Sequence, residues 1–173
     1  MTRIERVLTI KRKNPLMPED AKRSRYITGH LTRLPGVKKV RTNVVRIDET
    51  TLRAHVIPYF VLHRKALFLF HQLDGFGTLS GDSDNKYWRV TYEDELVRKV
   101  TWIPNPLPIQ DEMCAFLSGR HSADITVQGR IFLPSTLKPG KLFVREEDYD
   151  RLIPFSDIYW KTRREFTRLA FPF

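Results

Sequence analysis

Cysteine is nearly absent from this sequence, since Cys114 is the single cysteine among 173 residues. One cysteine cannot form an intramolecular disulfide, and it cannot supply a thiolate metal cluster. Domains held together by a disulfide framework or by such a cluster are therefore excluded. A reducing compartment is the simplest expectation.

Long apolar runs are also missing. No stretch approaches the roughly 18 apolar residues of a membrane-spanning helix, and the N-terminus lacks the apolar core of a signal peptide. We therefore expect a cytoplasmic protein, with the nucleus or peripheral attachment to a membrane as the alternatives.

Acidic residues are scarce in the first 47 residues, which hold three of them against thirteen lysines and arginines. The net charge of this segment equals the +10 of the whole chain, so residues 48–173 are neutral overall. Clustered basic side chains displace counterions from nucleic acid and are attracted to anionic lipid. We expect nucleic acid, nucleoprotein or an anionic membrane as the partner; a solvated surface that only aids solubility is the alternative. The predicted binding residues are Lys11, Arg12, Lys13, Lys22, Arg23, Arg25, Lys38, Lys39 and Arg41.

The order of helical and strand-like segments is irregular, which favours a single α+β domain over residues 1–173, with a mainly antiparallel sheet and about three helices packed on it. Proline and acidic residues start a helix at Pro18, and Ala21, Ile27, Leu31 and Leu34 form its predicted buried stripe. The other two predicted helices are Gln110–Ser118 and a helix capped by Ser156 that runs to Ala170, with Ile158, Tyr159, Phe166 and Leu169 inward.

Strands are predicted where β-branched and aromatic residues concentrate, and loops where glycine, proline and Asp or Asn do. The predicted strands are Arg3–Arg12, Lys38–Ile47, Leu52–Arg64 with an interruption at Pro58, Ala66–Leu73, Tyr87–Tyr92, Leu96–Ile103, Asp124–Leu133 and Leu142–Arg145. The clearest predicted loops are Gly75–Lys86, the proline-rich connector Pro104–Pro108 and Pro134–Lys141.

Aromatic residues stand next to basic residues at two places, Tyr87-Trp88-Arg89 and Tyr159-Trp160-Lys161. Exposed rings can stack on bases or lie at a membrane interface. Trp88 and Trp160 are therefore candidate contact residues. The alternative is that most of these rings belong to the core, because an alternating strand or a helical stripe must bury one face.

Catalytic patterns are weak. His55, His63 and His71 are spaced by eight residues, and Asp74, Asp82 and Asp84 lie in a predicted loop, so a metal-dependent nuclease remains an alternative. His30-Leu31-Thr32 matches one half of the paired His-x-Thr pattern of two-histidine phosphoesterases, but His121-Ser122-Ala123 breaks the second half. We predict no catalytic residue, no metal ligand and no cofactor.

The segment Gln128–Phe155 contains Gly129-Arg130-Ile131-Phe132-Leu133-Pro134, a loop with proline and lysine, and a closing Pro154-Phe155. Over these 28 residues it resembles the matrix proteins of vesiculovirus-type rhabdoviruses, in which such a strand runs into an exposed hydrophobic loop. The resemblance implies a basic N-terminal region that meets membrane and nucleocapsid, and a loop for membrane contact or self-association. Leu133, Pro134, Leu137 and Pro139 would form that loop. The chain contains neither a Pro-Pro-x-Tyr nor a Pro-Thr/Ser-Ala-Pro motif, which the budding function of such proteins uses.

These observations together favour a non-enzymatic, matrix-like viral structural protein in the cytoplasm of the host cell. It would bind nucleoprotein and anionic membrane and assemble as a homo-oligomer. The first alternative is a plain RNA- or DNA-binding accessory protein, such as a viral silencing suppressor or a nucleic-acid chaperone. The second is a metal-dependent nuclease or phosphoesterase.

Overall fold

The computed structural model describes residues 18–120 and 124–171. The predicted strand Arg3–Arg12 and the basic residues Lys11, Arg12 and Lys13 lie outside this part. The described elements are α1 (Pro18–Thr32), β1 (Val37–Asp48), β2 (Arg53–His63), β3 (Ala66–Gln72), β4 (Gly77–Asp82), β5 (Tyr87–Glu93), β6 (Arg98–Pro104), α2 (Pro106–Ser118), β7 (Thr126–Leu133), β8 (Leu137–Phe143), α3 (Glu146–Tyr149), β9 (Leu152–Pro154), the 3-10 turn η1 (Phe155–Asp157) and α4 (Ile158–Ala170). None of the described helices has the length and apolar character needed to cross a membrane.

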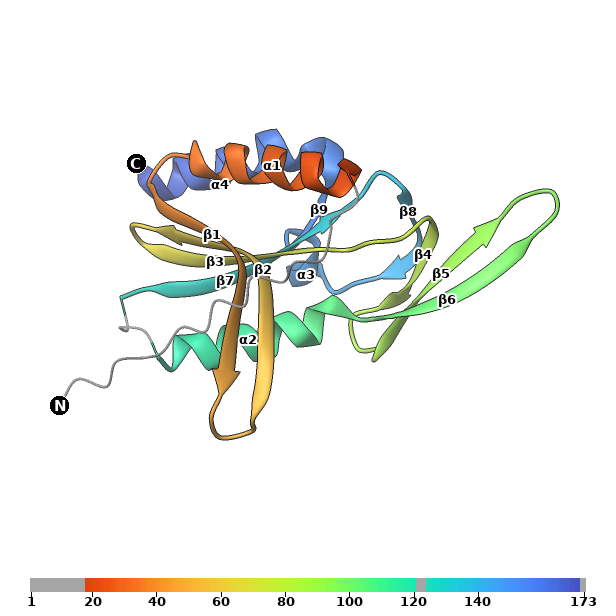
Figure 1. Cartoon of the computed structure of the whole chain (residues 1–173), viewed down its shortest axis with the longest axis horizontal. Coiled ribbons are helices and arrows are strands. Elements are labelled where there is room, and N and C mark those ends of the chain that lie inside the picture. The colour runs from red at the N-terminus through yellow and green to blue at the C-terminus, as the bar shows by residue number, and fades with distance from the viewer. Residues whose placement is uncertain (1–17, 121–123, 172–173) are drawn as a thin grey trace.

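The larger sheet, sheet A, has the strand order β1-β2-β3-β7-β9. Its first three strands are antiparallel, whereas β7 runs parallel to both β3 and β9. Helices α1 and α4 cover one face of sheet A and α2 covers the other (Figure 1). Phe68 and Phe70 of the central strand β3 pack under α1 and α4, together with Phe132 of β7 and Phe166 of α4. Leu67 and Leu69 of β3 point to the opposite face and pack against α2. The continuous apolar run of β3 is thus explained by burial on both faces.

The β1–β2 hairpin changes the face it presents along its length. Tyr59 packs under α1 and α4, whereas Ile57, two residues earlier, packs against α2. Between them lies Pro58, opposite Asn43, which has a positive φ of 52°. The predicted interruption at Pro58 is therefore a bend within one continuous strand.

The second sheet, sheet B, has the order β6-β5-β4-β8, with β8 parallel to β4 and the remaining pairs antiparallel. One face of sheet B buries Leu79, Trp88 and Val90 against Leu107 and the ends of β7 and β9. The β5–β6 hairpin extends beyond the rest of the molecule (Figure 1). Its two strands match the predicted Tyr87–Tyr92 and Leu96–Ile103 closely, because alternation and the acidic turn are local signals.

Two predicted loops are wrong. Gly75–Lys86 contains β4, and Pro134–Lys141 contains most of β8. Gly77 and Gly81 have φ angles of 130° and 153°, which suit glycine, and an added Cβ would overlap the Thr91 carbonyl at Gly77 and the Trp88 ring at Gly81. These glycines permit close approach of neighbouring strands, a role that the sequence pattern does not separate from a loop.

Two helices also begin differently from the prediction. Helix α2 starts at Pro106, since Asn105 caps it by accepting a hydrogen bond from the Leu107 N–H at 3.0 Å, and proline is tolerated in the first turn. Ser156 lies in η1 rather than capping α4, and Tyr159 is exposed rather than inward. The predicted α+β class is confirmed, with two mixed sheets in place of a single, mainly antiparallel one.

Candidate polyanion-binding pocket between α1 and α4

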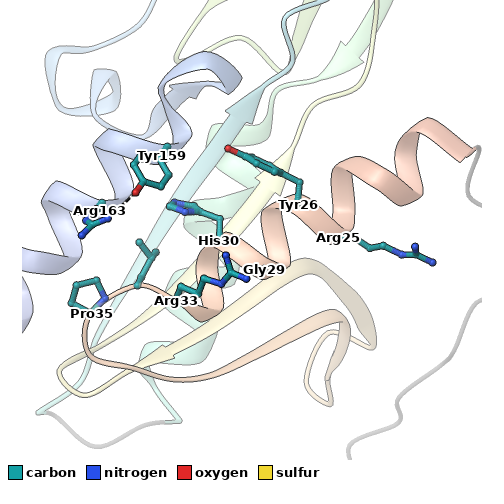
Figure 2. Close-up of a pocket in the computed structure, with 9 residues that line it drawn as sticks. Arg25, Tyr26, Gly29, His30, Arg33, Pro35, Tyr159 and Arg163 are labelled. Carbon is teal, nitrogen blue, oxygen red and sulfur yellow. Dashed lines mark hydrogen bonds between the residues drawn. The ribbon is translucent and has the colours of Figure 1, made fainter.

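A pocket of about 420 Å³ lies between the outer surfaces of α1 and α4 (Figure 2). Its lining residues come from α1, from the turn that follows it, and from one side of α4. They are Arg25, Tyr26, Gly29, His30, Arg33, Leu34, Pro35, Tyr159 and Arg163.

The pocket follows from the spacing of residues on α1. Arg25, Gly29 and Arg33 are four residues apart and so follow one line along the helix, while Tyr26 and His30 form the adjacent line. The opposite side of α1 is anchored by buried Ile27 and Leu31 under the helix pair. Burial of that stripe therefore turns the basic and aromatic lines toward solvent.

Gly29 provides room for the pocket. A Cβ built at Gly29 has no atom within 4 Å, so its surroundings are open. Glycine in a helix interior costs roughly 1 kcal/mol relative to alanine. At this position the missing side chain leaves space between Arg25 and Arg33.

Helix α4 contributes a second pair at four-residue spacing. Ile158, Thr162 and Phe166 are buried, which leaves Tyr159 and Arg163 on the side that faces the pocket. The Arg163 Nη1 donates a hydrogen bond to the Tyr159 hydroxyl at 2.7 Å. Figure 2 shows His30, Arg33 and Arg163 gathered between the helices, whereas the Arg25 guanidinium points outward at the rim.

His30 joins the two helices. Its Nε2 lies 2.7 Å from the Thr162 hydroxyl, which itself donates to the Ile158 carbonyl, so Nε2 carries the proton and donates. Burial lowers the pKa of His30, the nearby Arg163 lowers it further, and hydrogen bonding to the Ile158 backbone opposes both. His30 is therefore neutral at pH 7, and its Nδ1 is the unprotonated nitrogen.

The pocket is strongly cationic. Three arginines line it, and no acidic side chain lines it in the described part of the chain. Guanidinium groups bind phosphate oxygens in pairs, and tyrosine hydroxyls add neutral donors. The chemistry that the pocket offers is recognition of an anion.

Among the basic residues predicted from the sequence, Arg25 lines the pocket, and Lys22 lies exposed on the same helix. Arg23 is half-buried, with its guanidinium 5.9 Å from the Phe155 ring centroid. Lys38, Lys39 and Arg41 are exposed on β1, which begins two residues after Pro35 of the lining. Those three side chains are not part of the pocket.

The sequence patterns did not identify four of the lining residues as binding residues: His30, Arg33, Tyr159 and Arg163. Arg33 belongs to the basic segment but is not among the predicted binding residues, and Arg163 lies outside that segment. Four-residue spacing within each helix was the available signal. The pairing of α1 with α4 joins residues more than 120 positions apart, and no local pattern indicates it.

The two candidate tryptophans differ in exposure. Trp88 is completely buried in the core beneath sheet B, and its Nε1 donates to the Asp82 carbonyl at 2.7 Å, so the prediction that it contacts a ligand is wrong. Trp160 is 49% exposed on α4, with the Lys161 ammonium 5.6 Å from its ring centroid.

The predicted interaction loop is also wrong as an exposed element. Leu133, Pro134 and Leu137 are buried, and only Pro139 is exposed. Arg130, which precedes them in β7, has a packing role: it pairs with Glu165 of α4, and its guanidinium lies 5.7 Å from the Phe68 ring centroid.

The histidines do not converge. His55 stacks on Phe116 at 5.3 Å between ring centroids, on the α2 side of sheet A, whereas His63 meets Phe166 edge-on at 5.5 Å on the α4 side. Of the acidic residues, Asp82 accepts hydrogen bonds from the Asp84 and Asn85 amides, and Asp84 pairs with Arg145. Residues 18–120 and 124–171 contain no group of three His, Cys, Asp or Glu side chains placed to hold a metal ion. His121 lies outside them.

Comparisons with protein-family models, with curated proteins and with solved structures found no match to this chain.

Proposed function

We propose that this protein is a non-enzymatic, matrix-like structural protein that binds nucleic acid or nucleoprotein, and that the α1–α4 pocket holds the phosphate backbone. The observation that carries the proposal is a pocket lined by Arg33 from the α1 side and Arg163 from α4, with Arg25 at its rim and no acidic side chain in its described lining.

The chain's charge supports the same partner. A net charge of +10 attracts any polyanion at long range, while the pocket supplies the short-range donors. Binding that neutralises phosphates releases counterions, so its affinity falls steeply with salt concentration.

The test is fluorescence anisotropy of a labelled 30-nucleotide RNA, titrated with the full chain at several salt concentrations. The double variant Arg33→Gln/Arg163→Gln removes two phosphate contacts, so the slope of log affinity against log salt should fall in magnitude by about 1.4 for this single strand. The matched control Arg53→Gln/Arg120→Gln lowers the net charge equally on the α2 side of the molecule and should stay near wild type.

A second pair of variants tests the pocket without changing charge. Gly29→Leu should fill the space between Arg25 and Arg33 and weaken RNA binding, whereas Gly29→Ala should bind normally and be slightly more stable. Wild-type affinity in both Gly29→Leu and the double arginine variant would overturn the proposal.

An anionic membrane is the second candidate partner, and exposed Trp160 favours it. This side chain lies on α4 beside Lys161 and near Arg164, and tryptophan with flanking basic residues is typical of membrane interfaces. Sedimentation with vesicles containing phosphatidylserine, run beside the RNA titration, separates the two partners. Vesicle binding that is lost in Trp160→Ala, with no RNA binding, would assign this surface to lipid.

A further inference from the structure

Sheet B leaves one face open to solvent. Along β5 the side chains alternate, so Trp88 and Val90 point into the core while Tyr87 and Arg89 are exposed on the other side. Strand register places Trp102 of β6 directly opposite Arg89. Trp102 therefore belongs to the open face.

Three aromatic side chains are exposed on this face. Trp102 is 62% exposed, Tyr87 is 46% exposed, and Phe143 of β8 is 71% exposed. They come from three of the four strands of sheet B, so aromatic surface extends across the sheet.

The same face is basic. A shallow hollow of about 680 Å³ runs over it, and Arg89, Arg98, Lys138 and Lys141 line the hollow. Glu93 is the one acid in its described lining and lies opposite Arg98 across the hairpin. The remaining polar groups include hydroxyls, which accept and donate hydrogen bonds without charge.

An irregularity in β8 brings Lys141 to this face. Leu79 pairs with Pro139 and Gly81 pairs with Leu142, so Gly140 and Lys141 both oppose the single residue Ser80. Such a bulge redirects the following side chains. Lys141 thereby lines the same hollow as Lys138, which precedes the bulge, while Leu142 returns to the core beneath sheet B.

We propose that the open face of sheet B is a second binding site and that its ligand is single-stranded nucleic acid. The four basic side chains complement phosphates, and the exposed rings offer stacking surfaces that only unpaired bases can use. This proposal rests on the proposed function, because it takes nucleic acid as the partner, but it uses different residues from the α1–α4 pocket.

The composition of the face argues against a lipid ligand. Val100 is the one exposed aliphatic residue that pairs across the open face, opposite Thr91. The face thus combines basic and aromatic side chains, and few exposed aliphatic ones.

The test compares Trp102→Ala with the full-length wild type on labelled U20, dT20 and a 20-base-pair RNA duplex, by anisotropy at one salt concentration. Loss of stacking on Trp102 should weaken binding of the single strands about tenfold and leave the duplex unchanged. Trp102→Phe should keep most of the single-strand affinity. Tyr149→Ala removes another exposed aromatic side chain, on α3, and should leave the ratio of single-strand to duplex affinity unchanged. The U20 and dT20 arms show whether the ligand is RNA, DNA or either.

The two proposals fail in different ways. If Arg33→Gln/Arg163→Gln loses both ligands while Trp102→Ala loses neither, the α1–α4 pocket stands and this inference is overturned. The opposite outcome is that Trp102→Ala and Lys138→Gln/Lys141→Gln lose affinity for the single strands only, while Arg33→Gln/Arg163→Gln binds as the wild type does. The open face of sheet B would then be supported as a binding site and the α1–α4 pocket would not. A Trp102→Ala variant that changes only the sedimentation coefficient, or only vesicle binding, would assign the face to a second copy or to lipid and overturn the proposal. Trp102 lies exposed on an edge strand, and circular dichroism checks that each variant is folded.

Discussion

The side chain of Gln110 donates hydrogen bonds to backbone carbonyls of the parallel strands β3 and β7. It is fully buried, and its Nε2 donates to the Leu69 carbonyl at 3.1 Å and to the Arg130 carbonyl at 2.8 Å. Its Oε1 accepts a hydrogen bond from Arg151 at 3.0 Å. A Cβ at Gly129 would overlap this amide. Glycine at 129 is therefore explained by space for Gln110.

Gly129→Ala should destabilise the fold by roughly 2–4 kcal/mol, because the Gln110 amide is displaced and leaves buried carbonyls and Arg151 without partners. The backbone of Gly129 does not require a positive φ, so the penalty comes from the overlap. Urea unfolding monitored by fluorescence measures the effect. Gly119→Ala, at a position where a Cβ meets nothing closer than 3.9 Å, is the control and should change stability by less than about 1 kcal/mol. Equal stability of the two variants would contradict the role assigned to Gly129.

At the scale of elements, Asn105 ties the start of α2 to the turn between β4 and β5. Its Oδ1 accepts from the Leu107 N–H, and its Nδ2 donates to the Ser83 carbonyl at 3.0 Å and the Asn85 carbonyl at 2.7 Å. The side chain is buried. One residue thus supports both a helix N-terminus and the strand turn at the base of the open face.

Asn105→Ala should therefore cost about 2–3 kcal/mol, since the cap and the buried donors are lost together. Asn105→Asp keeps the acceptor for the cap but removes the donors, so it should reduce hydrogen-exchange protection in residues 83–86 more than at the start of α2. Amide exchange followed by mass spectrometry resolves the two segments. Asn85→Ala, which changes an exposed side chain while keeping the acceptor carbonyl, is the control. Uniform loss of protection across both segments in Asn105→Asp would contradict the separation of roles.

The elements that the sequence predicted well are those with local signals. Helix α1 has its proline and acidic start and its buried Ile27 and Leu31, and the β5–β6 hairpin has alternation around an acidic turn. Strand β4 was missed because Gly77 and Gly81 serve strand contacts that resemble loop chemistry in the sequence.

The candidate sites were only partly predictable for a related reason. Trp88 and Trp102 both lie on alternating strands of one hairpin, and register alone decides which is buried: Trp88 opposes Ile103, and Trp102 opposes Arg89. Arg25 was selected because it lies in the basic segment. Its partner Arg163 was not, because only the packing of α4 beside α1 brings it there.

At the scale of the whole molecule, burial lowers the pKa values of three histidines and so favours their neutral form. Burial lowers the pKa of His30 and His63, and burial with the nearby Arg151 lowers the pKa of His71 to about 4. An unfolded histidine takes up a proton near pH 6.5, so between these values the unfolded state binds more protons than the folded state. The stability contribution of each neutral histidine is present above pH 6.5 and is lost as the pH falls toward its folded pKa.

His71 alone should make the wild type roughly 2 kcal/mol less stable at pH 5 than at pH 7.5. Urea unfolding at both values measures the difference. His71→Gln removes the titrating group, so its stability should depend less on pH even if it is less stable at pH 7.5. An identical pH dependence in the variant and the wild type would contradict the assignment to His71.

The parallel pairing of β3 with β7 also sets the order in which the chain can fold. Residues 66–72 pair with residues 126–132, and the whole of β4, β5, β6 and α2 lies between them in the chain. Contacts between such distant segments form slowly, because the entropy of closing a long loop must be overcome first. During synthesis, the edge of β3 that pairs with β7 therefore stays unpaired until β7 has left the ribosome. A segment of the composition Ala-Leu-Phe-Leu-Phe is prone to aggregate in that interval. Yield in a cell should consequently depend on translation speed through residues 73–132 and on chaperones that shield β3.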